Sequence, residues 1–243
     1  YERWYAPNNA TLVVVGDVEP DKVLELAKQH YGALKPSVLM PSKPQRETAQ
    51  KGQRYIQVKA PAEVPYILMG YKTPALLTAK PEDAWEPYAL EVLTSILDGG
   101  NSSRFSRELV RGKELASSAS AWYDGFGRLP SLLTLSGTPA KDVKLETVKA
   151  ELLAQIERIK SELVSADELA RVKAQVIASE IYERDSIQHQ ATVLGSLESV
   201  GLGYKLMDDY VNKVLAVTPE QIQQVAKKYL VDDQLTIAEL VPQ

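Results

Sequence analysis

The chain has 243 residues, of which 44% are hydrophobic and 25% are charged, and its formal net charge is -4. These proportions are typical of a globular protein with a sizeable core, and the lack of a Lys/Arg cluster argues against a nucleic-acid partner. No apolar run approaches the roughly 20 residues that a membrane span needs. The chain contains no cysteine, which excludes disulfides, thiolate metal sites and a cysteine nucleophile.

The first predicted elements are a strand and a helix. Residues 11–15 form an apolar, β-branched run, which favours a strand. Glu19-Pro20-Asp21 then opens a helix with proline in its first turn and acids at its positive end, and Leu24, Ala27 and Tyr31 give that helix an apolar stripe. Residues 35–53 are rich in proline and polar residues, so we interpret them as a linker.

The middle of the chain predicts most of a sheet. Glycines at 99 and 100 suit a helix C-terminus, and a short helix follows them. The Asp124-Gly125-Phe126-Gly127 stretch predicts a hairpin turn. In chain order the pattern gives strands at 55–59 and 64–71, a helix at 81–97, and hairpin strands at 115–123 and 131–137.

The remainder is predicted to be largely helical with one late strand. Ser165 begins a capping box before a long helix that runs to Ile181, and Thr218 begins a second one. Residues 235–240 form the closing strand. Strands followed by helices and a late strand indicate an α+β fold, in which a mainly antiparallel sheet is covered by helices on one face.

An internal match sets the expected domain organisation. Residues 4–15, WYAPNNATLVVV, align with residues 228–239, KYLVDDQLTIAE: each reads as a helix ending on an aromatic residue, an Asn/Asp turn and a strand. A repeat at this separation predicts two large homologous halves. We therefore expect residues 1–34 to be the tail of one half, 35–53 a linker, and 54–243 a complete second half, with an upstream part not included in this sequence.

Few residues suggest chemistry on their own. There is no Gly-x-Ser-x-Gly elbow, phosphate loop or His-x-x-Glu-His motif. The two histidines, His30 and His189, are far apart in sequence, so we expect structural roles for both and no metal site. The glycine-rich stretch 99–104 precedes a helix and has two interpretations, an anion site or a plain turn and cap.

Residues 98–118, DGGNSSRFSRELVRGKELASS, resemble the signature of the second half of pitrilysin/insulinase-family zinc metallopeptidases, the family that includes mitochondrial processing peptidase. In that signature, Gly-Gly and Ser-Ser-Arg precede a short helix and a Leu-Ala-Tyr strand. Residues 5–9 and the valine-rich run after them are similar to the end of the family's first half. The resemblance spans essentially the whole chain, and it implies the duplicated fold.

The resemblance also implies where the catalytic groups lie. In this family the zinc ligands and the catalytic glutamate belong to the first half, on an inverted His-x-x-Glu-His helix, and none of them occurs here. We therefore expect no catalytic residue and no metal ligand in this chain, zinc in the full-length parent, and no activity from the chain alone.

A second family feature is degenerate. Catalytically assisting second halves carry an Arg and, seven residues later, a Tyr, which bind the substrate carbonyl. Aligning Leu115-Ala116 with the family's Leu-Ala puts Val110 at the Arg position and Ser117 at the Tyr position. Arg111 lies one place away, which turns a helical side chain by about 100°.

The missing pair implies a partner. The expected partner is a homologous zinc-free subunit that would supply the Arg and Tyr. The alternative is a second copy of the same protein, in a homodimer. Small residues from Ala116 to Ala121 fit a strand lying close to a peptide or another backbone; they fit equally well a strand that makes room for covering helices. The candidate substrate or partner contacts are Arg104, Arg111, Ser117 and Ser118.

Two function classes remain. The first is the non-catalytic C-terminal domain of a zinc metalloendopeptidase, which degrades or processes unfolded peptides and completes the substrate chamber with a partner subunit. The second is a catalytically inactive structural or assembly subunit of the same fold. The resemblance favours the periplasm or cell envelope of a bacterium, because many two-subunit members are exported.

Overall fold

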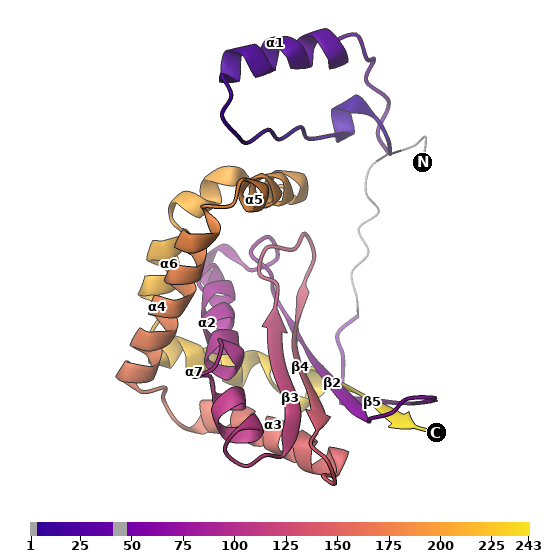
Figure 1. Cartoon of the computed structure of the whole chain (residues 1–243), viewed down its shortest axis with the longest axis vertical. Helices are drawn as coiled ribbons and strands as arrows, with labels where there is room; N and C mark the ends of the chain where they lie inside the picture. The colour runs from indigo at the N-terminus through magenta and orange to yellow at the C-terminus, as the bar shows by residue number, and fades with distance from the viewer. Residues whose placement is uncertain (1–3, 41–47) are drawn as a thin grey trace. The chain divides into compact units, whose positions relative to one another are not determined.

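The computed structural model describes residues 4–40 and 48–243, and it divides into two compact units. One unit comprises Tyr1–Ala49 with Glu180–Met207, and the other comprises Gln50–Ser179 with Asp208–Gln243. Figure 1 traces the chain through its elements. The division of the sequence at residues 34 and 53 stays a prediction, and residues 41–47 of the expected linker lie outside the described residues.

The larger unit is built on a five-stranded sheet in the order β1-β5-β2-β4-β3. The outer strand β1 pairs with β5 in parallel, and the other pairs are antiparallel. The expected mainly antiparallel α+β fold is therefore confirmed. The strands are β1 (Arg54–Ala60), β2 (Tyr66–Thr73), β3 (Ala116–Tyr123), β4 (Ser131–Pro139) and β5 (Leu235–Pro242).

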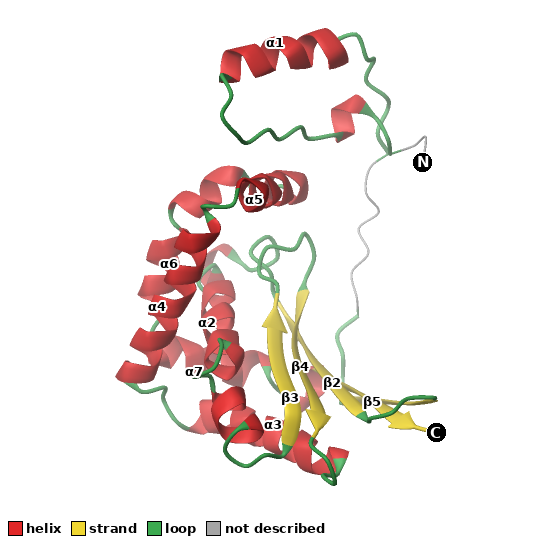
Figure 2. Cartoon of the chain, in the orientation of Figure 1, coloured by secondary structure: helices red, strands yellow, loops and turns green. Residues whose placement is uncertain are grey.

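Helices cover one face of this sheet. Helix α2 packs on β3, while α3 and α7 pack on the central strands (Figure 2). Gly137 of β4 lets α3 approach, because a Cβ atom there would lie 2.7 Å from Val148 Cγ1. The helical segments of this unit are η2 (Pro81–Asp83), α2 (Glu86–Asp98), the π-helix η3 (Phe105–Val110), α3 (Leu145–Ser161), most of α4 (Ala166–Glu183), α6 (Tyr210–Ala216), α7 (Pro219–Tyr229) and η5 (Asp232–Gln234).

A buried carboxylate joins two of the covering helices. Glu86 of α2 is 1% exposed, and its carboxylate accepts hydrogen bonds from Lys228 Nζ and from the Tyr229 hydroxyl, both at 2.5 Å. Burial, together with the hydrogen bond to Glu86, raises the pKa of Tyr229 to about 12. The α7 helix begins at the predicted capping box, in which Thr218 and Gln221 bond each other's backbone N–H groups.

The smaller unit contains η1 (Pro7–Asn9), α1 (Pro20–Tyr31), α5 (Ile187–Val200), the last residues of α4 and most of η4 (Tyr204–Asp208). The Asn8 side chain fixes the N-terminal loop, because it both donates to Ser37 O and accepts from Ser37 N at 3.0 Å. The apolar stripe of α1 is exposed: Leu24 and Tyr31 are 52% and 56% accessible.

The predicted strand at residues 11–15 is wrong. Its counterpart in the internal match, β5, has strands on both sides, whereas residues 11–15 have no ladder partner in the described part of the chain. A strand requires such a partner for its backbone groups. The turns that precede the two segments do agree, because η1 and η5 are both three-residue 3-10 turns.

We expect this difference to appear in hydrogen exchange. In a demonstrated monomer, the amides of residues 11–15 should exchange rapidly because they lack ladder hydrogen bonds, while those of β5 should be strongly protected. Mass-spectrometric hydrogen exchange on the same sample measures both segments, and β5 serves as the internal control. Equal, strong protection of the two segments would contradict this prediction.

Candidate functional site

The strand β3 forms one edge of the sheet and carries the small residues found in the sequence. Ser118, Ser120 and Trp122 alternate along its open face and are exposed, whereas Ala119 and Ala121 belong to the face on which α2 packs. The two interpretations of the small residues thus apply to different residues: the alanines give α2 room, and the serines line the uncovered face.

The outer edge of β3 is partly occupied by a side chain. The N–H of Ala121 donates to Asp98 Oδ2 at 3.1 Å. Burial raises the pKa of Asp98, although the hydrogen bonds from Ala121 and Ser120 oppose this rise. Asp98 therefore takes one of the edge donors that an added strand would use.

Ser117 lies at an irregularity of β3. The pairing with β4 shifts register between Ala116 and Ser118, so Ser117 is the bulged residue. It is exposed, and its hydroxyl donates to the backbone oxygens of Thr138 and Pro139 at 3.3 Å each. A bulge redirects the side chain it carries. The side chain at position 117, which the resemblance aligns with the family's Tyr, therefore does not follow the regular alternation of β3.

Val110 and Arg111 lie at the end of η3, next to the start of β3. The N–H of Leu115 donates to Leu109 O at 2.9 Å, which fixes this connection. Val110 is half-buried, and Arg111 is exposed with its guanidinium donating to Asn101 O. The two degenerate pair positions, Val110 and Ser117, thus belong to adjoining segments, and their assignment stays a prediction.

Arg104 differs from the other candidate contacts because it is 4% exposed. Its Nε and Nη2 atoms bind the two carboxylate oxygens of Glu168 at 3.0 and 2.7 Å. Burial of Glu168 opposes its ionisation, but the hydrogen bonds and charge of Arg104 outweigh this effect and lower the pKa of Glu168. Arg104 joins the loop before η3 to α4, so the structure gives it a role in the fold.

The face of the sheet opposite the helices is apolar and accessible. Strand register places side chains from all five strands on this face, and we call them the open sheet face. Its large apolar members are Ile56, Val58, Tyr66, Leu68, Trp122 and Leu132, with exposed fractions from 37% to 60%.

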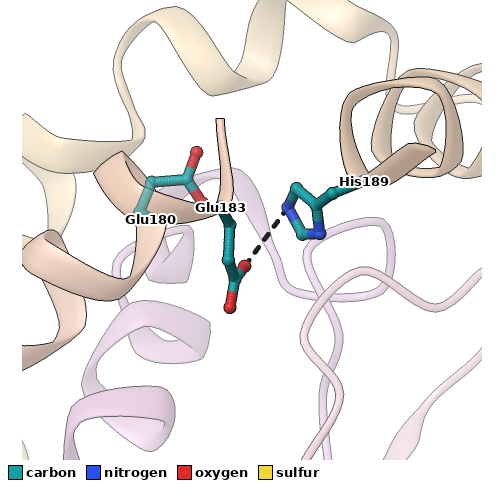
Figure 3. A group of neighbouring side chains, drawn as sticks. All are labelled: Glu180, Glu183 and His189. Atoms are coloured by element: carbon teal, nitrogen blue, oxygen red, sulfur yellow. Dashed lines mark ion pairs between the residues drawn. The ribbon is translucent and has the colours of Figure 1, made fainter. Parts of the chain in front are cut away.

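The smaller unit contains a group of possible metal ligands that the sequence analysis missed. Glu180, Glu183 and His189 each offer one ligand atom, and these atoms all lie within 4.8 Å of one another. Figure 3 shows His189 facing Glu183, with the Nε2 and Oε2 atoms 3.2 Å apart. The large separation of the two histidines predicted no metal site, whereas the signal for this group is a Glu-x-x-Glu helix end followed by a nearby His.

The zinc-binding motif that the family resemblance implies for the full-length parent does not occur in this chain, which has no His-x-x-Glu-His in either orientation. Among the helices of the described residues, none combines the length and apolar character needed to cross a membrane.

Comparisons with known proteins agree with the geometry. The chain is 31% identical over 245 residues to the zinc protease PqqE of Helicobacter pylori, covering 100% of this chain and 53% of that protein. A crystal structure of a protease from Helicobacter pylori superposes with a TM-score of 0.90 at 28% identity, covering 99% of this chain and 57% of that one. The first half of the periplasmic protease PqqL from Escherichia coli gives a TM-score of 0.80 at 17% identity, with coverages of 99% and 53%.

The chain thus spans about half the length of the relatives it matches. A family model described as the peptidase M16 inactive domain matches residues 1–176, which confirms the resemblance seen in residues 98–118. The chain belongs to the M16 (pitrilysin) peptidase family, as a domain of its inactive type.

Proposed function

We propose that this chain is the non-catalytic C-terminal domain of a zinc-dependent metalloendopeptidase that acts on unfolded peptides. The open sheet face lines the substrate chamber, and a partner subunit completes that chamber. The observation that carries the proposal is this apolar, accessible face in a domain whose family consists of zinc proteases.

The open sheet face suits an unfolded chain. Its apolar side chains are spread over several strands and alternate with small polar ones such as Ser118 and Ser120. Burial of apolar surface contributes about 25 cal/mol per Å² without directional requirements, so such a face binds extended peptides of varied sequence. An exposed apolar area of this kind marks an interaction surface.

The domain supplies binding surface, and the chemistry belongs to other parts. Zinc and the general base are assigned to the catalytic half of the full-length parent. The carbonyl-binding Arg and Tyr are assigned to a homologous zinc-free subunit, or to a second copy in a homodimer. The reason is that the side chains of Val110 and Ser117 cannot take the place of that pair in binding the substrate carbonyl. The periplasm or cell envelope is the proposed compartment.

Site-specific photocrosslinking tests this assignment. In the full-length parent with its partner, a photoreactive phenylalanine analogue replacing Trp122 should crosslink to a labelled unfolded peptide, because Trp122 lies on the open sheet face and is 60% exposed. The same analogue replacing Leu163, which is 52% exposed in the α3–α4 connection, is the matched control. Crosslinks should form at position 122 and be absent at 163.

The outcome also separates the two function classes. If the analogue at position 122 gives no more peptide crosslinking than the one at 163, the chamber assignment is wrong. Crosslinks from position 122 to another folded subunit, with no peptide bound, would instead identify an assembly subunit.

A further inference from the structure

We propose that Glu180, Glu183 and His189 form a binding site for a divalent transition-metal ion, with Zn²⁺ as the best-suited ion. The three ligand atoms all lie within 4.8 Å of one another. This site does not depend on the proposed peptidase role, and its residues follow the stretch 1–176 that matches the family model.

The donor set selects the class of ion. One imidazole nitrogen and two carboxylate oxygens suit Zn²⁺ and its neighbours in the first row, whereas Ca²⁺ and Mg²⁺ prefer oxygen ligands alone. Copper(I) prefers sulfur ligands, and this group has none. Two ionised carboxylates carry a charge of -2, which a divalent cation neutralises.

The closest pair already has the spacing of a zinc site. In a tetrahedral site with bonds of about 2.05 Å, two ligand atoms lie roughly 3.3 Å apart. The Nε2 atom of His189 and the Oε2 atom of Glu183 are 3.2 Å apart. The third ligand, Glu180, needs to approach by about 1.5 Å or less on the same geometry, which rotations of its flexible side chain supply.

A short, hydrogen-bonded turn holds the ligands together. Glu180 and Glu183 are three residues apart in the last turn of α4, so both point to one side of the helix. After Glu183, the Ser186 N–H donates to Glu183 O at 3.1 Å, and the Ser186 hydroxyl accepts from the His189 N–H at 3.2 Å. The N-cap of α5 therefore fixes His189 relative to the end of α4.

One interaction that competes with an ion, between Arg184 and Glu180, is weak. Arg184 Nε lies 3.4 Å from Glu180 Oε1, and the Arg184 side chain is 53% exposed. Exposed pairs of this kind contribute about 0–1 kcal/mol, so an ion displaces the guanidinium at small cost. Glu183 and His189 are accessible at 48% and 32%, which gives the ion an entry path and leaves a coordination position for water.

Isothermal titration of the untagged 243-residue chain with ZnCl₂ tests the site. We expect one Zn²⁺ per chain, no binding of Mg²⁺, and cobalt(II) absorption bands typical of mixed nitrogen and oxygen ligands. His189→Gln should weaken Zn²⁺ binding by more than about tenfold, since loss of an outer partner alone costs 10–100-fold.

His30→Gln is the matched control, because it removes the chain's other histidine from α1 and should leave the affinity unchanged. Circular dichroism establishes that each variant is folded, and Glu180→Gln provides a second ligand variant that keeps the turn intact. The proposal is overturned if Zn²⁺ does not bind saturably, if His189→Gln binds as tightly as the parent, or if His30→Gln loses the site equally.

Discussion

The full-length parent should hydrolyse an unfolded peptide weakly alone, and its kcat should rise about 100-fold or more when a homologous subunit bearing the Arg/Tyr pair is added. The reason is the loss of donors: the resemblance places Val110 and Ser117 where that pair stands. A preorganised donor to the developing oxyanion contributes about 2.7–4 kcal/mol, or 10²–10³ in kcat.

Turnover of one labelled peptide, measured with and without the neighbouring homologue, tests the expectation. Full activity of the lone protein, unchanged by the homologue, would remove the two-subunit hypothesis while leaving the family membership intact.

A double variant examines the same idea within the domain. Val110→Arg with Ser117→Tyr should raise the activity of the lone parent about tenfold, since a hydrogen bond from a charged donor contributes about 1.5–3 kcal/mol. Ser117 is exposed on its bulge, so a phenol there has space. The control combines Val110→Arg with Ser120→Tyr, which places the same ring elsewhere on β3 and should give no gain.

The sequence predicted the elements whose signals are local. Both capping boxes are visible as residue patterns. In the structure the Glu168 N–H donates to the Ser165 hydroxyl, and Thr218 and Gln221 bond each other's backbone N–H groups. The β3–β4 hairpin could also be found, because its Asp/Gly turn residues lie between two strand-like stretches. Such patterns involve residues close in sequence, so the interactions they predict depend little on the rest of the fold.

Other features depended on partners distant in sequence. A β-branched run predicts a strand only if another strand lies beside it, which residues 11–15 lack in the described part of the chain. The parallel pairing of β1 with β5 joins residues about 180 positions apart, such as Tyr55 and Ile237, and no local pattern encodes it.

The candidate site likewise combines features with a local sequence signal and features that depend on residues distant in sequence. The motif around residues 98–118 identified the family and made Arg104 a candidate substrate or partner contact, but its ion pair with Glu168 could not be predicted because that partner lies 64 residues away. The metal-ligand group was missed because it depends on how tightly α4 turns into α5. Side-chain burial and the geometry of a turn both arise from packing, which a residue pattern alone does not contain.

Arg104→Met should lower the free energy of unfolding by about 3–5 kcal/mol, the usual cost of leaving one partner of a buried ion pair alone. The variant removes both hydrogen bonds to Glu168, whose side chain is only 13% exposed. Arg107→Met is the matched control: Arg107 is 48% exposed in its pair with Glu108, and such pairs contribute about 0–1 kcal/mol. Urea denaturation of the three proteins at pH 7 measures the difference.

The double variant Arg104→Met, Glu168→Met should recover most of the loss, because replacing a buried pair by apolar residues of similar volume is often nearly neutral. The pH dependence has a defined sign. The folded state lowers the pKa of Glu168, so the stability that its ionisation contributes is present above the unfolded value of about 4.3 and is lost as pH falls through the folded pKa. At pH values under about 4, the free energy of unfolding of the parent should therefore decrease relative to that of the double variant. If Arg104→Met is no less stable than Arg107→Met, the Arg104–Glu168 ion pair does not hold the loop before η3 against α4. Arg104 would then again be a candidate for contact with a partner.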